Sequence, residues 1–105
     1  MLLESFTPEE ERVILECLRA AADGPFFPDW EFQTLFGFSR DELRKIISCW
    51  PSITANEASV NITISTTLGQ LTGYPLNWDE VSPAYVSASL EEVSAIYEKW
   101  KRKHL

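Results

Sequence analysis

Apolar side chains recur every three or four residues through much of this chain, a spacing that places them on one face of an α-helix. The first helix is predicted to begin after Thr7, because a threonine, a proline and, three residues on, a glutamate form a capping box. It is predicted to end at residues 23–25, where Asp-Gly-Pro cannot continue it. A second, short helix is predicted from Asp29, as its cap, to about Phe36, where Gly37 stops it.

Two more capping boxes predict the later helices. Ser39, followed by Arg-Asp-Glu-Leu, opens a helix that Trp50 and Pro51 close. Ser89, followed by Leu-Glu-Glu-Val, opens the last helix, which runs into a basic tail. Between them, residues 60–68 form a run rich in β-branched side chains.

This β-branched run fits two structures. Strict alternation at Val60, Ile62 and Ile64 favours a strand, whereas the spacing of Val60, Ile64 and Leu68 favours a helix. An isolated strand would leave its backbone groups unpaired, and the sequence offers no second convincing strand. We therefore predict a helix that ends near Gly73, with a strand as the alternative.

The second half of the chain repeats the first at an offset of about fifty residues, a period typical of an internal duplication. The repeated positions begin a helix, line its apolar stripe or mark a turn. The pairs include Ser39 and Ser89, Leu43 and Val93, Ile46 and Ile96, Trp50 and Trp100, Ile14 and Ile64, Leu18 and Leu68, Pro25 and Pro75, and Asp29 and Asp79. The predicted fold is a small all-α helical bundle, a single domain over residues 1–105, whose two helical halves (about 6–50 and 56–105) are related by an approximate two-fold.

Composition supports one ordinary globular domain. The chain has 105 residues, of which 45% are hydrophobic and 24% are charged. No apolar run approaches the roughly 20 residues that span a bilayer. The start lacks a basic leader followed by an apolar core, so a cytoplasmic location is expected. Cys17 and Cys49 fall near predicted apolar stripes and are expected to be buried, reduced thiols.

The aromatic window over residues 26–32 reads Phe-Phe-Pro-Asp-Trp-Glu-Phe. In a small domain such rings either fill the core or form a contact patch, and the core is the favoured interpretation. Trp30, within this window, is nevertheless a candidate anchor for a partner. A second candidate anchor is Trp78, which follows Pro75 and stands beside Asp79 and Glu80.

The charge distribution argues against a surface made for nucleic acid. The formal net charge is −7, and no Lys, Arg or His lies between Ile46 and Glu98. The basic residues at 99–103 fit a helix C-terminus, where cations complement the helix dipole.

A helix-turn-helix motif is the main competing interpretation. Apolar residues and Gly37 have the required spacing, and the helix over residues 40–49 would be the recognition helix. It would expose Arg40, Arg44 and Lys45 to DNA. The acidic character of the chain argues against this alternative.

A weak carboxylate-based enzyme is the third possibility. The candidate carboxylates around the aromatic turns are Asp29, Glu31, Asp79 and Glu80, and a pair of them could converge across the approximate two-fold. The chain has one histidine, His104, close to its end, and no recognisable catalytic motif. No spacing predicts a metal site, and no cofactor is expected.

The string Gly-Pro-Phe-Phe-Pro-Asp-Trp-Glu-Phe at 24–32, with Thr-Leu-Phe-Gly at 34–37 and Gly-Tyr-Pro at 73–75, resembles a group of small bacterial cytoplasmic proteins of uncharacterised function. The resemblance implies a bacterial origin, and it transfers no catalytic residue to this chain.

Together these features predict a small acidic protein that is not an enzyme and that binds another protein, a basic one in the favoured version. An immunity-type or inhibitor role suits a compact anionic domain, because its field steers it towards a cationic partner. The predicted contact residues are Trp30, Trp78, Asp79 and Glu80. The sequence leaves the oligomeric state open.

Overall fold

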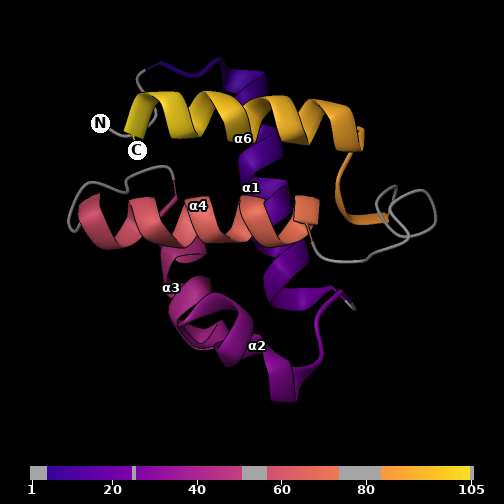
Figure 1. The fold of residues 1–105 in the computed structure, drawn as a ribbon, viewed down its shortest axis with the longest axis vertical. Coiled ribbons are helices and arrows are strands. Elements are labelled where there is room, and N and C mark those ends of the chain that lie inside the picture. Colours follow the sequence, from indigo (N-terminus) through magenta and orange to yellow (C-terminus); the bar gives the residue numbers. More distant parts are fainter. Residues whose placement is uncertain (1–4, 25, 51–56, 74–83, 105) are drawn as a thin grey trace.

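The described residues form helices and no strand, which confirms the predicted all-α fold (Figure 1). The computed structural model describes residues 5–24, 26–50, 57–73 and 84–104. Five helices lie in these ranges: α1 (Pro8–Asp23), α2 (Asp29–Phe36), α3 (Arg40–Cys49), α4 (Glu57–Gly73) and α6 (Leu90–His104).

The long helices α1, α4 and α6 meet at the centre of the molecule. In Figure 1, α4 and α6 lie side by side and α1 crosses both of them, with α2 and α3 grouped at the lower end. α4 packs against α1, α2 and α6, and α1 packs against α3. The radius of gyration is 12.7 Å, close to the value of about 13 Å that is usual for a folded domain of this size.

α1 begins as its capping box predicts. The backbone N–H of Glu10 donates to the Thr7 hydroxyl at 3.0 Å, and the Thr7 N–H donates to the Glu10 carboxylate at 2.9 Å. Two backbone donors that the helix itself cannot satisfy therefore have partners. The predicted stripe of α1 is buried, with Ile14 and Leu18 fully inaccessible to solvent.

α4 is a helix across the run for which a strand was the alternative. Val60, Ile64 and Leu68 are buried, whereas Ile62 is 60% exposed, so the alternation of β-branched residues has no structural counterpart. Thr67, buried on the same helix, donates its hydroxyl hydrogen to the backbone carbonyl of residue 63 at 2.8 Å. Packing against three other helices outweighs the β-propensity of the sequence.

The aromatic window mainly fills the core, as favoured from the sequence. Phe27, Phe32, Phe36 and Phe38 form one buried cluster, in which the rings of Phe32 and Phe36 stack 4.2 Å apart. The exception is Trp30, which is 80% exposed.

α6 brings the largest buried side chain to the core. Trp100 is inaccessible to solvent, its indole N–H donates to the Asn61 side-chain oxygen at 2.7 Å, and its ring lies 5.3 Å from that of Phe6. α6 begins at a serine cap, because the N–H of Glu92 donates to the Ser89 hydroxyl at 3.1 Å.

The internal two-fold repeat stays a prediction. Ser39 and Ser89 both cap helices, and Leu43 and Val93 are both fully buried at matching positions. The part of the second half that would correspond to the start of α2 falls within residues 74–83, outside the described residues.

The expectations for the two cysteines, for the Asp29 cap and for membrane spans can be compared with the structure. Cys17 is buried as predicted, but the prediction for Cys49 was wrong, because this thiol is exposed at the end of α3. Asp29 is the first residue of α2 and does not cap it, since Pro28 occupies the cap position without a side-chain bond. Over the described ranges, no helix has the length and apolar character needed to cross a membrane.

Candidate protein-binding surface

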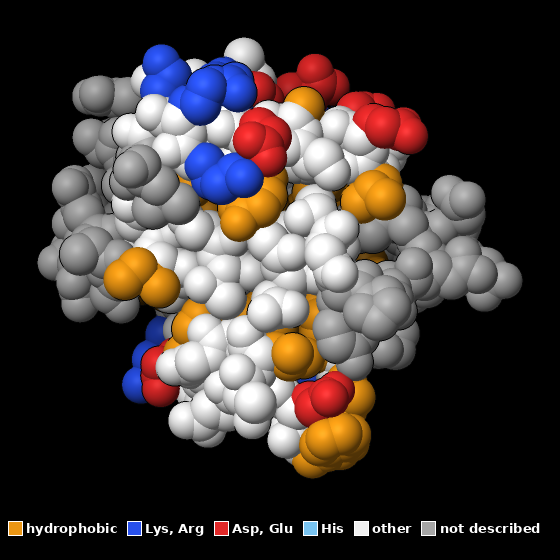
Figure 2. Space-filling view, in the orientation of Figure 1, with side chains coloured by type: hydrophobic (Ala, Val, Ile, Leu, Met, Phe, Trp, Pro, Cys, Tyr) orange, Lys and Arg blue, Asp and Glu red, His pale blue; other side chains and the backbone are white. Residues whose placement is uncertain are grey.

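Trp30 projects from the first turn of α2 into solvent. Phe32 lies two residues further on, which is a rotation of about 200° around a helix, so burying Phe32 turns Trp30 outwards. Phe36, one turn after Phe32, is buried on the same side. Figure 2 shows hydrophobic side chains exposed at the lower end of the molecule, where α2 lies.

Three exposed carboxylates lie around the start of α2, next to Trp30 in the sequence or on the hollows beside Asp29. Asp29 is the neighbour of Trp30, and the Asp29 side chain is 95% exposed even though it pairs with Arg40 at 3.0 Å. Asp23 and Asp41, both largely exposed, pair with Arg44 at 3.1 and 3.4 Å. The end of the molecule around α2 therefore combines one exposed indole with three exposed aspartates.

Two shallow hollows lie on either side of the Asp29–Arg40 ion pair. One, of about 390 Å³, is bounded by the end of α1 and the start of α2, and the other, of about 330 Å³, lies between α2 and α3. Both are lined by Asp29, Arg40 and Arg44. A partner side chain that entered either hollow would meet a carboxylate with an arginine beneath it.

Arg40, proposed from the sequence as a DNA contact, instead binds backbone carbonyls of its own chain. Its guanidinium donates to the backbone carbonyls of Ala21, Ala22 and Phe27 at 2.9, 3.0 and 2.6 Å, and it lies 4.4 Å from the centre of the Phe32 ring. The side chain is 17% exposed. It therefore satisfies carbonyls at the C-terminus of α1, which a helix leaves without partners.

Arg44 reinforces the same end of α1. It donates to the Ala22 carbonyl at 3.2 Å and to the Asp23 carboxylate at 3.1 Å. Its hydrogen bonds to Asp23, together with the charges of Asp23 and Asp41, raise the pKa of Arg44 above its ordinary value. Lys45, by contrast, is exposed and has no ion pair among the residues that the structure describes.

The turn between α2 and α3 has a feature of helix-turn-helix motifs. Gly37 adopts a left-handed conformation with φ of 80°, which favours glycine, and it ends α2. The helix-turn-helix interpretation remains a prediction. Two of its three proposed DNA contacts are nevertheless engaged with α1, and Lys45 alone is free to reach a phosphate.

The predicted second part of the surface cannot be placed beside the first. Trp78, Asp79 and Glu80 lie outside the described residues. Of the predicted site residues, the structure therefore brings Arg40 and Arg44 together at the end of α1 and places Trp30 nearby on α2.

Catalytic groups and metal ligands can be assessed within the described ranges. No group of three or more His, Cys, Asp or Glu side chains there is arranged to hold a metal ion. The Ser87 hydroxyl donates to Glu16 at 2.9 Å and accepts from Arg12 at 2.7 Å. This cluster connects α1 to the segment before α6, and the carboxylate-enzyme alternative remains a prediction.

Asp23 and Asp41 were not predicted as part of this surface. Asp23 appeared as a helix end and Asp41 as a first-turn acid. Asp23 and Arg44 are 21 residues apart, too far for a helical spacing rule to connect them. The one sequence feature that pointed to these contacts was Arg44, which lies one helical turn after Arg40.

No family model matches the chain, and no curated protein or solved structure matches it.

Proposed function

We propose that this chain is a non-catalytic acidic domain that binds another protein through a surface centred on Trp30. The single observation that carries the proposal is the 80% exposure of this indole at the start of α2. A tryptophan buries a large area at small entropic cost, and such side chains are enriched among the residues that dominate binding energy. Asp29, the neighbour of this tryptophan in the sequence, and the exposed Asp23 and Asp41, which line the same hollows as Asp29, favour a basic partner.

The balance of charges supports a cationic partner. The net charge is −7, and among the described residues five of the nine Lys and Arg side chains form ion pairs with acidic side chains. These five are Arg12, Arg40, Arg44, Lys99 and Lys101. The pairing leaves few cations to repel a basic surface. An immunity-type or inhibitor role would use this field to steer the partner and the indole to hold it.

The experiment compares capture of partners by variants of the immobilised chain. Wild type, Trp30→Ala and Ile62→Ala are each incubated with lysate of the native cell, and the bound proteins are quantified by mass spectrometry. Ile62 is the matched control, because it is a large apolar residue that is 60% exposed on a different helix, α4. We expect one protein to be captured by wild type and Ile62→Ala and to fall at least tenfold with Trp30→Ala, a loss of about 1.4 kcal/mol.

A second pair of variants tests the acidic component. Asp79→Lys combined with Glu80→Lys should abolish capture while helicity, measured by circular dichroism, stays unchanged. Equal capture by all variants would contradict the proposal. Salt-dependent binding of duplex DNA that charge reversal at Lys45 weakens would support the helix-turn-helix alternative in its place.

A further inference from the structure

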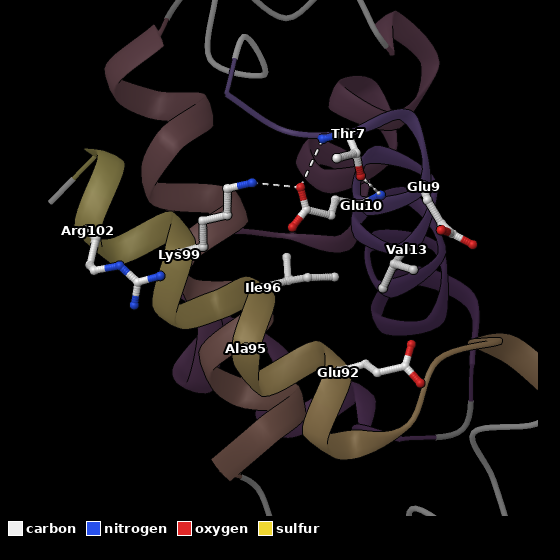
Figure 3. Close-up of a pocket in the computed structure, with 9 residues that line it drawn as sticks. All are labelled: Thr7, Glu9, Glu10, Val13, Glu92, Ala95, Ile96, Lys99 and Arg102. Atoms are coloured by element: carbon white, nitrogen blue, oxygen red, sulfur yellow. Dashed lines mark hydrogen bonds and ion pairs between the residues drawn. The ribbon is translucent and has the colours of Figure 1, made fainter.

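A groove lies between the first turns of α1 and the outer side of α6, at the other end of the molecule from α2 (Figures 1 and 3). Its volume is about 430 Å³. Three apolar residues, Val13, Ala95 and Ile96, contribute to its lining. The remaining lining residues are Thr7, Glu9, Glu10, Glu92, Lys99 and Arg102.

One ion pair within the groove is internal to the fold. Lys99 donates to Glu10 at 2.7 Å, and each side chain is only 25% exposed. Burial alone would raise the pKa of Glu10, but the hydrogen bonds from Lys99 and from the Thr7 N–H, with the Lys99 charge, hold it below its ordinary value. This pair joins α1 to α6, so it is not available to a ligand.

The charges left over stand at opposite ends of the groove. Figure 3 shows Glu92 at one end of α6 and Arg102 at the other, with Ala95 between them. Arg102 is exposed and has no ion pair with any residue in the described ranges. The Glu92 carboxylate, also exposed, accepts a 3.3 Å hydrogen bond from the Ser89 hydroxyl.

This order of charges makes α6 complementary to an antiparallel copy of itself. Glu92 and Arg102 are separated by ten residues, about 15 Å along a helix. In an antiparallel pair each acid meets the base of the other helix. A two-fold axis perpendicular to the helices produces that arrangement, and two-fold dimers are the commonest protein oligomers. Figure 2 shows the same separation, with basic side chains over the C-terminal end of α6 and acidic ones towards its start.

We propose that a second copy of this chain docks on this groove, with the two α6 helices antiparallel across a two-fold axis. Glu92 then pairs with Arg102 of the partner subunit, and the symmetric pair forms on the other side. Ala95 is exposed and small, so the two helices approach closely, and the aliphatic part of the partner's Lys99 covers it. Val13 and Ile96 are already only 4% and 7% exposed, so the contact depends mainly on the ion pairs and on the burial of Ala95.

The net charge of each copy opposes this association. Repulsion between two chains of charge −7 acts over long distances, and at about 0.15 M salt the Debye length of about 8 Å screens most of it. Ion pairs in contact are screened less. Each exposed pair contributes little alone, so the dimer is weak and forms as the protein concentration rises. The α2 end remains open, and this inference does not depend on the proposed function.

Sedimentation equilibrium at about 0.15 M salt tests the dimer. The variants are Glu92→Lys, Arg102→Glu, the double variant, and an equal mixture of the two single variants. Glu42→Lys is the matched control for Glu92→Lys, because the N–H groups of both glutamates donate to a serine cap and both variants place a cation in the first turn of a helix. Lys45→Glu, at an exposed cation on α3, is the control for Arg102→Glu.

We expect wild type and both controls to show the same monomer–dimer equilibrium. Each single reversal at α6 should raise the dissociation constant at least tenfold, while the double variant and the mixture should recover the dimer. A wild type that stays monomeric up to about 1 mM overturns the proposal, as does an equal effect of the controls. Should circular dichroism show that Glu92→Lys does not fold, Arg102→Glu against Lys45→Glu decides the question alone.

Discussion

Replacing Arg40 with alanine should destabilise the protein far more than removing any exposed cation. The guanidinium satisfies three backbone carbonyls and pairs with one carboxylate, and it connects α1, α2 and α3. Alanine would remove the guanidinium from the Ala21 and Phe27 carbonyls, while the Ala22 carbonyl keeps its bond from Arg44, at a position that is only 17% exposed. This perturbation separates a structural arginine from a DNA-binding one, because a nucleic-acid contact is removable at little cost to stability.

The magnitude follows from the contacts. Loss of the charged donor costs about 1 kcal/mol at each of the Ala21 and Phe27 carbonyls, since water reaches the site in part, and somewhat less at the Ala22 carbonyl, which Arg44 still contacts. The Asp29 pair adds little because its carboxylate is almost fully exposed. The stacking of Arg40 over the Phe32 ring adds about 0.5 kcal/mol. The sum is about 3 kcal/mol, against a total stability of about 5 to 15 kcal/mol for a domain of this size.

Urea denaturation followed by circular dichroism measures the difference, with Lys45→Ala on the same helix as the control. We expect Lys45→Ala to change the free energy of unfolding by less than about 0.5 kcal/mol. Arg40→Lys should lie between wild type and Arg40→Ala, because one ammonium cannot reach three carbonyls in the geometry of the guanidinium. A loss of less than about 1 kcal/mol for Arg40→Ala, with an unchanged m-value, would refute the structural role assigned to this side chain.

Three other measurements test local features. Gly24→Ala should destabilise the protein by about 1 to 3 kcal/mol, because its new Cβ would lie 2.5 Å from the Ala20 carbonyl oxygen. Gly73→Ala, where a Cβ has open space, should be neutral or stabilising, and thermal melts of both variants measure the difference. Because the pKa of Glu10 is lowered in the folded protein, the ionised carboxylate stabilises the fold fully above its ordinary pKa of 4.5, and this stabilisation is lost as the pH falls through the folded pKa. The difference in free energy of unfolding between wild type and Glu10→Gln should therefore narrow below about pH 4.5, as measured by urea denaturation at a series of acid pH values. A thiol reagent followed by mass spectrometry should label the exposed Cys49 in the native protein and spare Cys17, since burial, with the charge of Glu16, raises the pKa of Cys17 to about 12; labelling of both at equal rates would contradict the burial.

Capping signals located most of the helices because they act locally. The helices that begin after Thr7, Ser39 and Ser89 start where the sequence predicts. A hydrogen bond from a backbone N–H to a side-chain oxygen three residues earlier fixes the helix start within one turn. The start of α2 was missed by one residue. Asp29 had the right type for a cap, but Arg40 lies close enough to take its carboxylate, and that contact spans eleven residues.

Side-chain periodicity did not distinguish a helix from a strand where the sequence fitted both periods. In α4 the β-branched residues satisfied both the strand and the helix pattern, and the tertiary contacts of Ile64 and Leu68 resolved the choice. Cys49 illustrates the same limit at a helix end. It is the last residue of α3, and its thiol is exposed even though Trp50, the next residue, packs partly against the core.

The candidate surface was only partly accessible to sequence reasoning, because the role of a charged residue depends on its distant neighbours. Trp30 could be proposed as a contact from its acidic flanks, and the burial of Phe32 explains why it points outwards. Arg40 and Arg44 carried the spacing of a recognition helix. Their engagement with the end of α1 follows from the packing of α3 on α1, which no local pattern encodes.

The repeated and the unrepeated positions have different structural roles. Positions shared by the two halves, such as Ser39 and Ser89, begin helices or fill the core. Arg40, by contrast, corresponds in the predicted repeat to Leu90, which is 38% exposed. A leucine side chain has no hydrogen-bond donor, so Leu90 cannot make the carbonyl contacts of Arg40 at the start of α6. Where the predicted repeat falls on described residues, its shared positions account for helix starts and core contacts, and the two-fold itself stays a prediction. The residues that differ explain why α2 and α3 are held at one end of the molecule, where they present Trp30 to solvent.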